Sequence, residues 1–175
     1  MPKPIDPTAR LRTSFLAAVA EFREDPDYPL PWFVTDVDPQ ALVDPAAFDA
    51  YVERVLSERD GDAPPRWEGF VPMTTLWWVD GEQMIGRLAI RHRLTPSLEQ
   101  SGGHIGYDVR PSARRRGHAR AMLSASLPIA ASLGITEALV TCNGTNVASR
   151  RVIESNGGQY VDTVDGKHRY WVPTF

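Results

Sequence analysis

The segment Asp108-Val-Arg-Pro-Ser-Ala-Arg114-Arg-Arg-Gly117-His-Ala119-Arg120 decides the fold of this chain. It is typical of the end of a strand, a short basic loop and the start of a helix. Three arginines and a glycine fall where the first turn of a helix presents N–H groups that lack a partner. This arrangement suits an anion, and a pyrophosphate best. A solvated run of charges at a helix start is the alternative interpretation.

The segments on either side of this loop support a strand–helix unit. Residues 103–109 have the pattern of a strand, and residues 116–133 have apolar side chains at helical spacing. Gly134 is expected to end that helix. Pro128 lies inside it and is expected to kink or split it, because proline has no N–H group and crowds the preceding turn.

The rest of the chain divides into further helices and strands. Asp44 and Asn146 are expected to cap helices over residues 45–59 and 147–155. Asp80-Gly81 and Asp165-Gly166 are turn signals inside two predicted hairpins. The remaining predictions are a helix at 8–23, strands at 73–79, 83–92, 136–142, 159–164 and 167–172, and loops at 25–31, 61–65 and 94–102. The alternation of strands and helices predicts an α/β domain.

Length and composition set the class of the chain. Its 175 residues are enough for one domain with a core, and 42% hydrophobic and 23% charged residues are typical of a globular protein. A single cysteine, Cys142, excludes an internal disulfide. The first residues lack the apolar core of a signal peptide, and no apolar run is long enough to span a membrane. We therefore expect a cytoplasmic protein without a membrane partner.

Charge is distributed unevenly along the chain. Residues 1–100 hold 10 basic and 17 acidic side chains, whereas residues 101–175 hold 9 basic and 5 acidic ones. The basic part fits an anionic cofactor and the acidic part a cationic acceptor, although chance scatter would also explain the split. A net charge of −3 without a long basic stripe argues against nucleic acid as the main partner.

The loop resembles the signature of the GNAT superfamily of acyl-CoA-dependent N-acyltransferases. That signature is Arg or Gln, two residues, Gly, one residue, and Gly or Ala, and it stands here as Arg114-Arg-Arg-Gly117-His-Ala119. A second element, Asn146-Val-Ala-Ser149 followed by Gly157-Gly158, is similar to the Asn-x-x-Ser acyltransferases related to the ribosomal-protein N-acetyltransferases. Arg91-His92 with Gly103-His-Ile-Gly-Tyr107 resembles a subgroup of uncharacterised bacterial acetyltransferases.

The resemblance implies a single domain over residues 1–175. Residues 1–70 would form a helical region on the acceptor side, and residues 71–175 would form the sheet and bind acetyl-CoA. The expected architecture is a mixed central sheet of six to seven strands with about four flanking helices. The strand before the loop is expected to carry a bulge and to splay from the next strand, so that the pantetheine arm of the cofactor fits between them.

The resemblance also implies which residues hold acetyl-CoA. Backbone N–H groups of the basic loop would bind the pyrophosphate, and backbone groups of the preceding strand would pair with pantetheine amides. Asn143 and Asn146 are either cofactor contacts or ordinary turn and cap residues. The expected cofactor-binding residues are Tyr107, Asp108, Val109, Arg114, Arg115, Arg116, Gly117, His118, Ala119, Asn143, Asn146 and Ser149. No metal is expected.

Direct transfer to an amine needs a group that takes a proton from the amine and one that stabilises the leaving thiolate. The tyrosine that many relatives use for the second task is replaced here by Ile153. Ser149 is a candidate for it, or is an ordinary helix-capping residue. His104 is the first candidate for the base, with Asp108 and Glu99 as alternatives. A hydrogen-bonded wall residue is the other interpretation of His104.

Trp32, Phe33 and His92 are candidates for lining the acceptor site, although core packing would also explain the aromatic residues. The function expected is transfer of an acetyl group from acetyl-CoA to a primary amine of a small molecule or peptide. A non-catalytic acyl-CoA-binding module is the alternative, and nucleic-acid binding through the arginine cluster is a third hypothesis that the net charge opposes. A homodimer is compatible with either of the first two.

Overall fold

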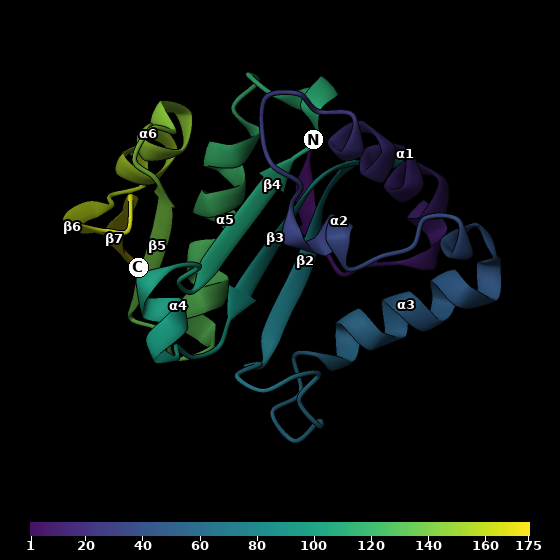
Figure 1. Cartoon of the computed structure of the whole chain (residues 1–175), viewed down its shortest axis with the longest axis horizontal. Helices are drawn as coiled ribbons and strands as arrows, with labels where there is room; N and C mark the ends of the chain where they lie inside the picture. The colour runs from purple at the N-terminus through teal and green to yellow at the C-terminus, as the bar shows by residue number, and fades with distance from the viewer.

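The computed structural model describes all residues, 1–175, and has seven strands in two neighbouring antiparallel sheets (Figure 1). The larger sheet has the order β1-β2-β3-β4 and the smaller has the order β5-β7-β6. The strands are β1 (Lys3–Ile5), β2 (Met73–Asp80), β3 (Gln83–Arg91), β4 (Ile105–Val109), β5 (Glu137–Asn143), β6 (Gln159–Val164) and β7 (Lys167–Pro173). The helices are α1 (Arg12–Arg23), α2 (Trp32–Thr35), α3 (Pro45–Ser57), α4 (Pro96–Gln100), α5 (His118–Ser132) and α6 (Val147–Ser155). This confirms a single α/β domain with about four main helices.

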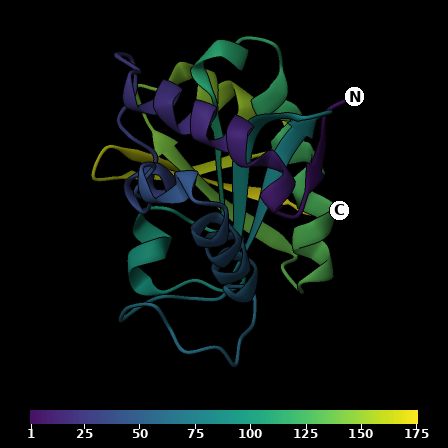
Figure 2. The ribbon, with the colours of Figure 1, turned by 90° about the vertical axis from the view of Figure 1, so that its right-hand side faces the viewer.

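The helices cover the sheet from both sides. Helices α1, α2 and α3 lie on one face of the larger sheet, and α5 packs on the other (Figure 2). Alternate residues of β2 serve the two layers, because successive strand side chains point to opposite faces. Trp77 belongs to the cluster under α1–α3, whereas Leu76 and Trp78 belong to the cluster under α5 and α6. The sheet therefore has a core on each side.

Local signals predicted several element ends correctly. The Asp44 carboxylate accepts a hydrogen bond from Ala47 N–H at 3.0 Å and begins α3. Gly134 has φ +86° and ends α5. Pro128 does not split α5, because the helix continues through it without a break. That part of the prediction is wrong. The short elements β1, α2 and α4 were not predicted, and α4 lies within the expected loop 94–102.

The two sheets separate between β4 and β5. They meet near α4, where His104 N–H donates to the Leu139 carbonyl at 2.7 Å, and they diverge toward the end where α5 and α6 begin (Figure 1). Gly103 permits the close approach, since it has φ +59° and an added Cβ would lie 2.3 Å from the Leu139 oxygen. The expected splayed strands are therefore present.

The expected bulge in the strand before the loop is not present. The register of β4 against β3 is continuous from Ile105 to Val109, and the irregularity lies between Trp78 and Val79 of β2. The gap beside β4 arises instead from its divergence from β5.

None of the helices combines the length and the apolar composition needed to cross a bilayer.

Candidate active site

The basic loop presents a row of backbone donors. The six consecutive N–H groups from Arg115 to Arg120 donate no hydrogen bond to any acceptor in the protein. Arg115 and Gly117 both have a left-handed backbone, with φ of +64° and +83°. Left-handed residues interspersed in a turn direct successive N–H groups toward one point and form a concave anion site. Nothing lies within 4 Å of where a Gly117 Cβ would be, so the site is open.

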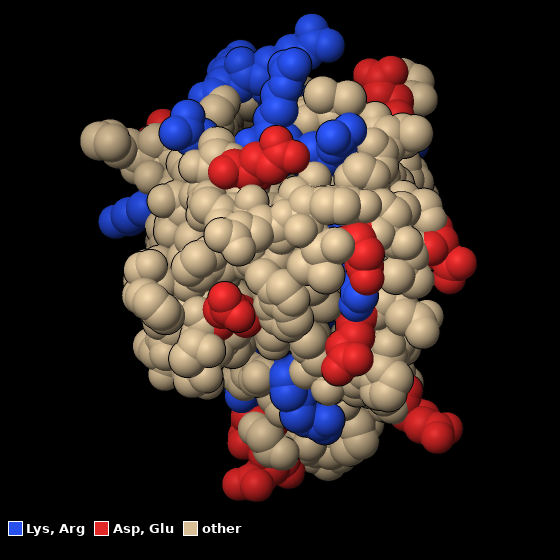
Figure 3. Space-filling model, turned by 90° about the vertical axis from the view of Figure 1, so that its left-hand side faces the viewer, with Lys and Arg blue, Asp and Glu red and all other residues tan.

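The arginine side chains of this loop differ in their surroundings. Arg115 and Arg116 are exposed, and Lys and Arg side chains gather at this end of the molecule (Figure 3). Arg114 instead donates to the Asp25 carboxylate at 2.7 Å and to the Val109 carbonyl at 3.0 Å. The Arg114 side chain therefore fixes the loop to the segment after α1, and its guanidinium is not free for a phosphate.

The two residues that begin α5 contribute mainly backbone. The His118 ring accepts a hydrogen bond from the Trp78 indole at 3.2 Å, so the side chain is held against β2. Its N–H group belongs to the free row. Ala119 follows with a side chain too small to obstruct that row.

The edge of β4 that faces the gap carries free backbone groups, apart from the Val109 carbonyl, which accepts from Arg114 Nε. Arg110 N–H donates to Ile85, and the His104 carbonyl accepts from Arg91, so even-numbered residues of this strand face β3. In an antiparallel ladder the alternate residues face the other way. The backbone groups of Tyr107 and Val109 thus point toward β5. The backbone groups of Asp108 point toward β3, where Asp108 is paired with Arg87. The prediction that the Asp108 backbone faces the cofactor arm is wrong for this geometric reason.

A side-chain pair spans the wide end of the gap. The Tyr107 hydroxyl lies 2.8 Å from the Ser149 hydroxyl, which joins β4 to the first turn of α6. Burial raises the pKa of Tyr107 to about 12, so the phenol stays protonated. Ile153, at the position where relatives carry their tyrosine, is fully buried. A tyrosine therefore approaches this region from β4 instead of from α6, which the spacing of the motif did not indicate.

The two candidate asparagines have turn and cap roles. Asn146 Oδ1 accepts from Ser149 N–H at 3.1 Å and caps α6, and the Asn143 carbonyl accepts from Asn146 N–H. Cys142 is buried, and burial raises the pKa of its thiol. A protonated thiol is a poor nucleophile, which suits direct transfer without an acyl-enzyme.

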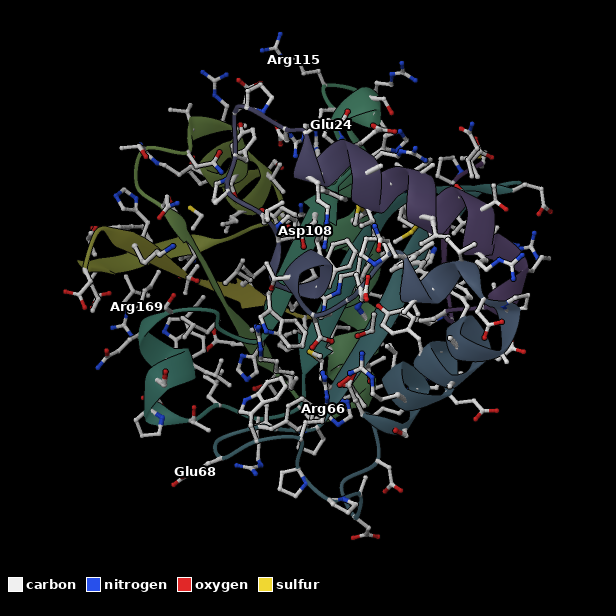
Figure 4. The ribbon with its side chains drawn as sticks, turned by 45° about the vertical axis from the view of Figure 1, so that its right-hand side comes forward. Glu24, Arg66, Glu68, Asp108, Arg115 and Arg169 are labelled. Atoms are coloured by element: carbon white, nitrogen blue, oxygen red, sulfur yellow. The ribbon has the colours of Figure 1, made fainter.

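Asp108 points to the face opposite Tyr107, toward α2 (Figure 4). Its side chain is 30% exposed, and its carboxylate lies 4.0 Å from Arg87 Nη1, too far for a hydrogen bond. Burial raises the pKa of Asp108, and the positive charges of Arg87 and Arg114 oppose the rise only in part. A half-buried carboxylate without a hydrogen-bond donor is suited to accept a proton.

His104 has a structural role that its position in the sequence did not show. The ring Nδ1 of His104 accepts a hydrogen bond from Leu139 N–H at 2.8 Å. The backbone N–H of His104 donates to the Leu139 carbonyl. Burial, with a further effect from Arg91, lowers the pKa of His104. Protonation of Nδ1 would break the link between the sheets. The contacts therefore favour a strand-joining residue over a catalytic base.

This role of His104 is testable by stability. We expect His104→Ala to lower the free energy of unfolding by about 1–3 kcal/mol, because Leu139 N–H loses its acceptor. The His104→Asn variant should retain most of the wild-type free energy of unfolding, because the Asn Oδ1 can accept the same hydrogen bond as Nδ1. Chemical denaturation measures both, and a wild-type stability in His104→Ala with a large loss of turnover would instead support catalysis.

The lowered pKa also predicts a pH dependence. Unfolded histidine takes up a proton below about pH 6.5, whereas folded His104 resists it. The contribution of His104 to stability is thus complete above that pH and is lost as the pH falls below it. His104→Asn should show a smaller loss of stability between pH 7.5 and 5 than the wild type. Equal losses in the two proteins would contradict this assignment.

The three candidates for lining the acceptor site do not lie together in the structure. Trp32 and Phe33 both line a narrow pocket beneath α2 and α3, where Trp32 is 41% exposed and Phe33 is buried. His92 lines neither this pocket nor the neighbouring one, and its Nε2 lies 2.7 Å from the Thr74 hydroxyl. His92 therefore lies apart from Trp32 and Phe33, and its role as an acceptor-lining residue stays a prediction without support from these contacts.

A charged network near this pocket was not predicted from the sequence. Asp36 accepts hydrogen bonds from Arg54 at 2.9 Å and from Arg66 at 2.9 and 3.1 Å. Burial acts to raise the pKa of Asp36, but the two arginines outweigh it and lower it. Glu58 is nearly buried beside them, and burial raises its pKa. The members are far apart in sequence, so no local pattern could have revealed them.

Glu99, the other alternative base, is exposed on α4. No three His, Cys, Asp or Glu side chains lie close enough together to hold a metal ion. The row of free N–H groups and the gap between the diverging strands are the features that binding of an acyl-CoA donor requires.

The chain belongs to the acetyltransferase (GNAT) domain family, whose model matches residues 10–159. None of the curated proteins matches it. Three solved structures illustrate the shared fold. One is Mycobacterium smegmatis RimJ in complex with CoA-disulfide, with 16% sequence identity and a TM-score of 0.66. The alignment covers 98% of this chain and 80% of the RimJ chain.

RimL, the ribosomal L7/L12 α-N-protein acetyltransferase in complex with coenzyme A, has 16% identity and a TM-score of 0.65, covering 98% and 93% of the two chains. The microcin C7 self-immunity acetyltransferase MccE, in complex with acetyl-CoA and AMP, has 9% identity and a TM-score of 0.64, covering 98% and 92%. At these identities the similarity establishes the fold, and it does not transfer an acceptor to this chain.

Proposed function

We propose that this chain transfers an acetyl group from acetyl-CoA directly to the primary amine of a small molecule. The observation that carries the proposal is the row of six free N–H groups from Arg115 to Arg120, which fits a diphosphate. The gap-facing backbone of Tyr107 and the N–H group of Val109 fit the amides of the pantetheine arm, whereas the Val109 carbonyl is engaged by Arg114. The residues present therefore suit the diphosphate and the pantetheine arm of the donor.

The chemistry is divided between the two faces of β4. The amine approaches from the side of α2, and Asp108 accepts the proton that it loses as its nitrogen attacks the thioester carbon. A C–N bond forms, the C–S bond breaks, and the sulfur leaves with the electron pair. Asp108 replaces His104 as the proposed base because its carboxylate is free of hydrogen bonds.

Tyr107 and Ser149 are proposed to stabilise the leaving sulfur. A phenol with a pKa of about 12 is a weaker acid than a thiol, so its O–H stabilises the thiolate by a hydrogen bond instead of giving up its proton completely. Ser149 orients that phenol through the 2.8 Å contact or donates in its place. Asn146 holds the first turn of α6 in position through Ser149 N–H.

The proposal is tested by two measurements on the wild type. Acetyl-CoA should raise the melting temperature, and an amine panel followed by thiol release and mass analysis should identify an acetylated product. The absence of the usual tyrosine at Ile153 is the observation that favours a non-catalytic acyl-CoA-binding module. Stabilisation by acetyl-CoA with no product from any amine would support that module.

The Tyr107–Ser149 pair gives a further prediction. We expect Tyr107→Phe and Ser149→Ala each to lower kcat by about tenfold or more with little change in acetyl-CoA affinity, because each removes a transition-state contact. The double variant should be no slower than the slower single variant by more than a few-fold, since the two hydroxyls act together. Steady-state kinetics checks this, and unchanged turnover in Ser149→Ala would leave it as a capping residue only.

A further inference from the structure

The Arg87 guanidinium is buried without a hydrogen-bond partner. Arg87 is 7% exposed, and its Nε is among the buried polar atoms that have no partner. Its nearest opposite charge is Asp108, at 4.0 Å. Arginine stays protonated in proteins and carries five donors. The carboxylates of Asp36 and Glu58 line the same pocket as Arg87, but neither accepts a hydrogen bond from it. Burial of a guanidinium without hydrogen-bond acceptors is costly, so the position favours an anionic ligand.

The surroundings of Arg87 form a pocket rather than a sealed core. The rings of Trp32 and Phe33 lie on the guanidinium, with centroids 5.9 and 5.3 Å from its central carbon. The pocket measures about 10 Å³, and the half-exposed Trp32 forms part of its wall. Space of this size accepts one oxygen atom, such as that of a planar carboxylate, and is too small for a phosphate.

A second unpaired group lines the same pocket. The Thr75 hydroxyl is buried without a partner. Thr75 lies on the same face of the sheet as Arg87, two residues along the ladder, because it pairs with Ala89 whereas Arg87 pairs with Trp77. The other cations nearby are already engaged, since Arg54 and Arg66 both donate to Asp36. Within the lining of this pocket, Arg87 and Thr75 are thus buried donors that no other residue engages.

We infer that Arg87 and Thr75 bind a carboxylate that the acceptor amine carries. The inference rests on the proposed function and specifies the class of its substrate. Arg87 Nη1 lies 4.0 Å from the Asp108 carboxylate, so the carboxylate and the amine of one acceptor must be separated by only a few bonds. Free α- or β-amino acids meet this requirement. The N-terminus of a peptide does not, because its first carbonyl group is a neutral amide.

Figure 4 shows how this arrangement relates to the donor site. Asp108 lies in the middle of the molecule, with Arg115 of the donor loop at the upper end and Arg66 of the charged network below. An amino acid bound between Arg87 and Asp108 would thus present its nitrogen toward β4. The thioester would reach β4 from the gap on its other side.

The test compares amino acids with their own carboxamides as acceptors. With the wild type we expect each accepted amino acid to exceed its amide in kcat/KM by at least about tenfold, the usual effect of a hydrogen-bonded charge. Arg87→Met should bring each pair to within about twofold, and Thr75→Val should reduce the preference partially. Arg93→Met is the control, because Arg93 is exposed at the neighbouring pocket and should leave the preference unchanged.

A binding measurement makes the inference independent of turnover. N-acetylglycine carries the carboxylate without a reactive amine, and N-acetylglycinamide lacks the charge. Because Trp32 and Trp77 line the pocket, tryptophan fluorescence should respond to the first compound and not to the second. The response should be lost in Arg87→Met. If that variant does not fold, the wild-type comparison and Thr75→Val still decide the question.

The outcomes separate the two proposals. Amides acetylated as well as amino acids, or a preference that survives in folded Arg87→Met, would overturn the carboxylate site and leave the acetyltransferase proposal intact. If no amine is acetylated, the fluorescence titration decides alone. Equal responses to the two probes, or none to either, would then overturn the carboxylate site.

Discussion

Gly117→Glu is expected to abolish acetyl-CoA binding and to leave the fold intact. The new carboxylate would lie at the row of free N–H groups from Arg115 to Arg120, where it would take up donors and repel a diphosphate. One pair of like charges at about 4 Å costs about 1 to 4 kcal/mol between water and a protein surface. One such pair alone therefore lowers the affinity by about 5- to 1,000-fold, and the second negative charge of a diphosphate adds to this loss. Calorimetry or the thermal shift with acetyl-CoA measures the loss.

The chain offers a matched control at the other end of the same helix. Gly134 also has a left-handed backbone, with φ +86° against +83° for Gly117, and neither has an atom within 4 Å of an added Cβ. Gly134→Glu thus imposes the same backbone strain, about 1–2 kcal/mol, without touching the loop. It should be less stable than Gly117→Glu, because a negative charge is unfavourable at the C-terminus of a helix. Equal acetyl-CoA affinity in both variants would show that the loop is not the donor site.

Asp108→Asn is expected to have the largest effect on turnover. Loss of a general base lowers the rate by about 10²- to 10⁴-fold, and asparagine keeps the size of the side chain while removing its proton affinity. Acetyl-CoA affinity should change little. The Glu99→Gln variant is the control, because Glu99 is the exposed alternative base on α4 and should retain wild-type turnover.

The pH dependence of activity follows from the same group. The raised pKa of Asp108 means that the active carboxylate form is lost at a higher pH than for an exposed aspartate. The wild-type kcat/KM should therefore fall as the pH decreases through that raised value, and this limb should be absent in Asp108→Asn.

The ionisation of Asp108 that raises the activity should lower the stability of the folded protein. This difference separates a catalytic role from a structural one. A carboxyl group with a raised folded pKa binds its proton more tightly in the folded state. Its ionisation therefore costs stability as the pH rises through the folded value. Asp108→Asn should be at least as stable as the wild type at pH 7.5. A variant that is slow only because it is unfolded would contradict the assignment of Asp108 as the base.

The sequence by itself determined most of the elements and the basic loop that we propose as the donor site. Helix caps, turns and apolar periodicity act over a few residues, so Asp44, Asn146 and Gly134 could be interpreted without knowing what packs around them. The row of N–H groups is also local, because it follows from a left-handed Gly117 before a helix. The sequence missed β1, α2 and α4, which are too short to show a clear period.

Only the tertiary structure decided which side chains are free to act. Arg114 and His104 have suitable chemistry, but Asp25 and Leu139, both distant in sequence, engage them. Tyr107 meets Ser149 across the gap, and Arg87 remains unpaired in a buried pocket. Whether a polar group is satisfied depends on neighbours that the chain brings together from far apart. For this reason the proposed donor site follows from the local sequence, whereas the proposed base and the proposed acceptor site follow from the fold.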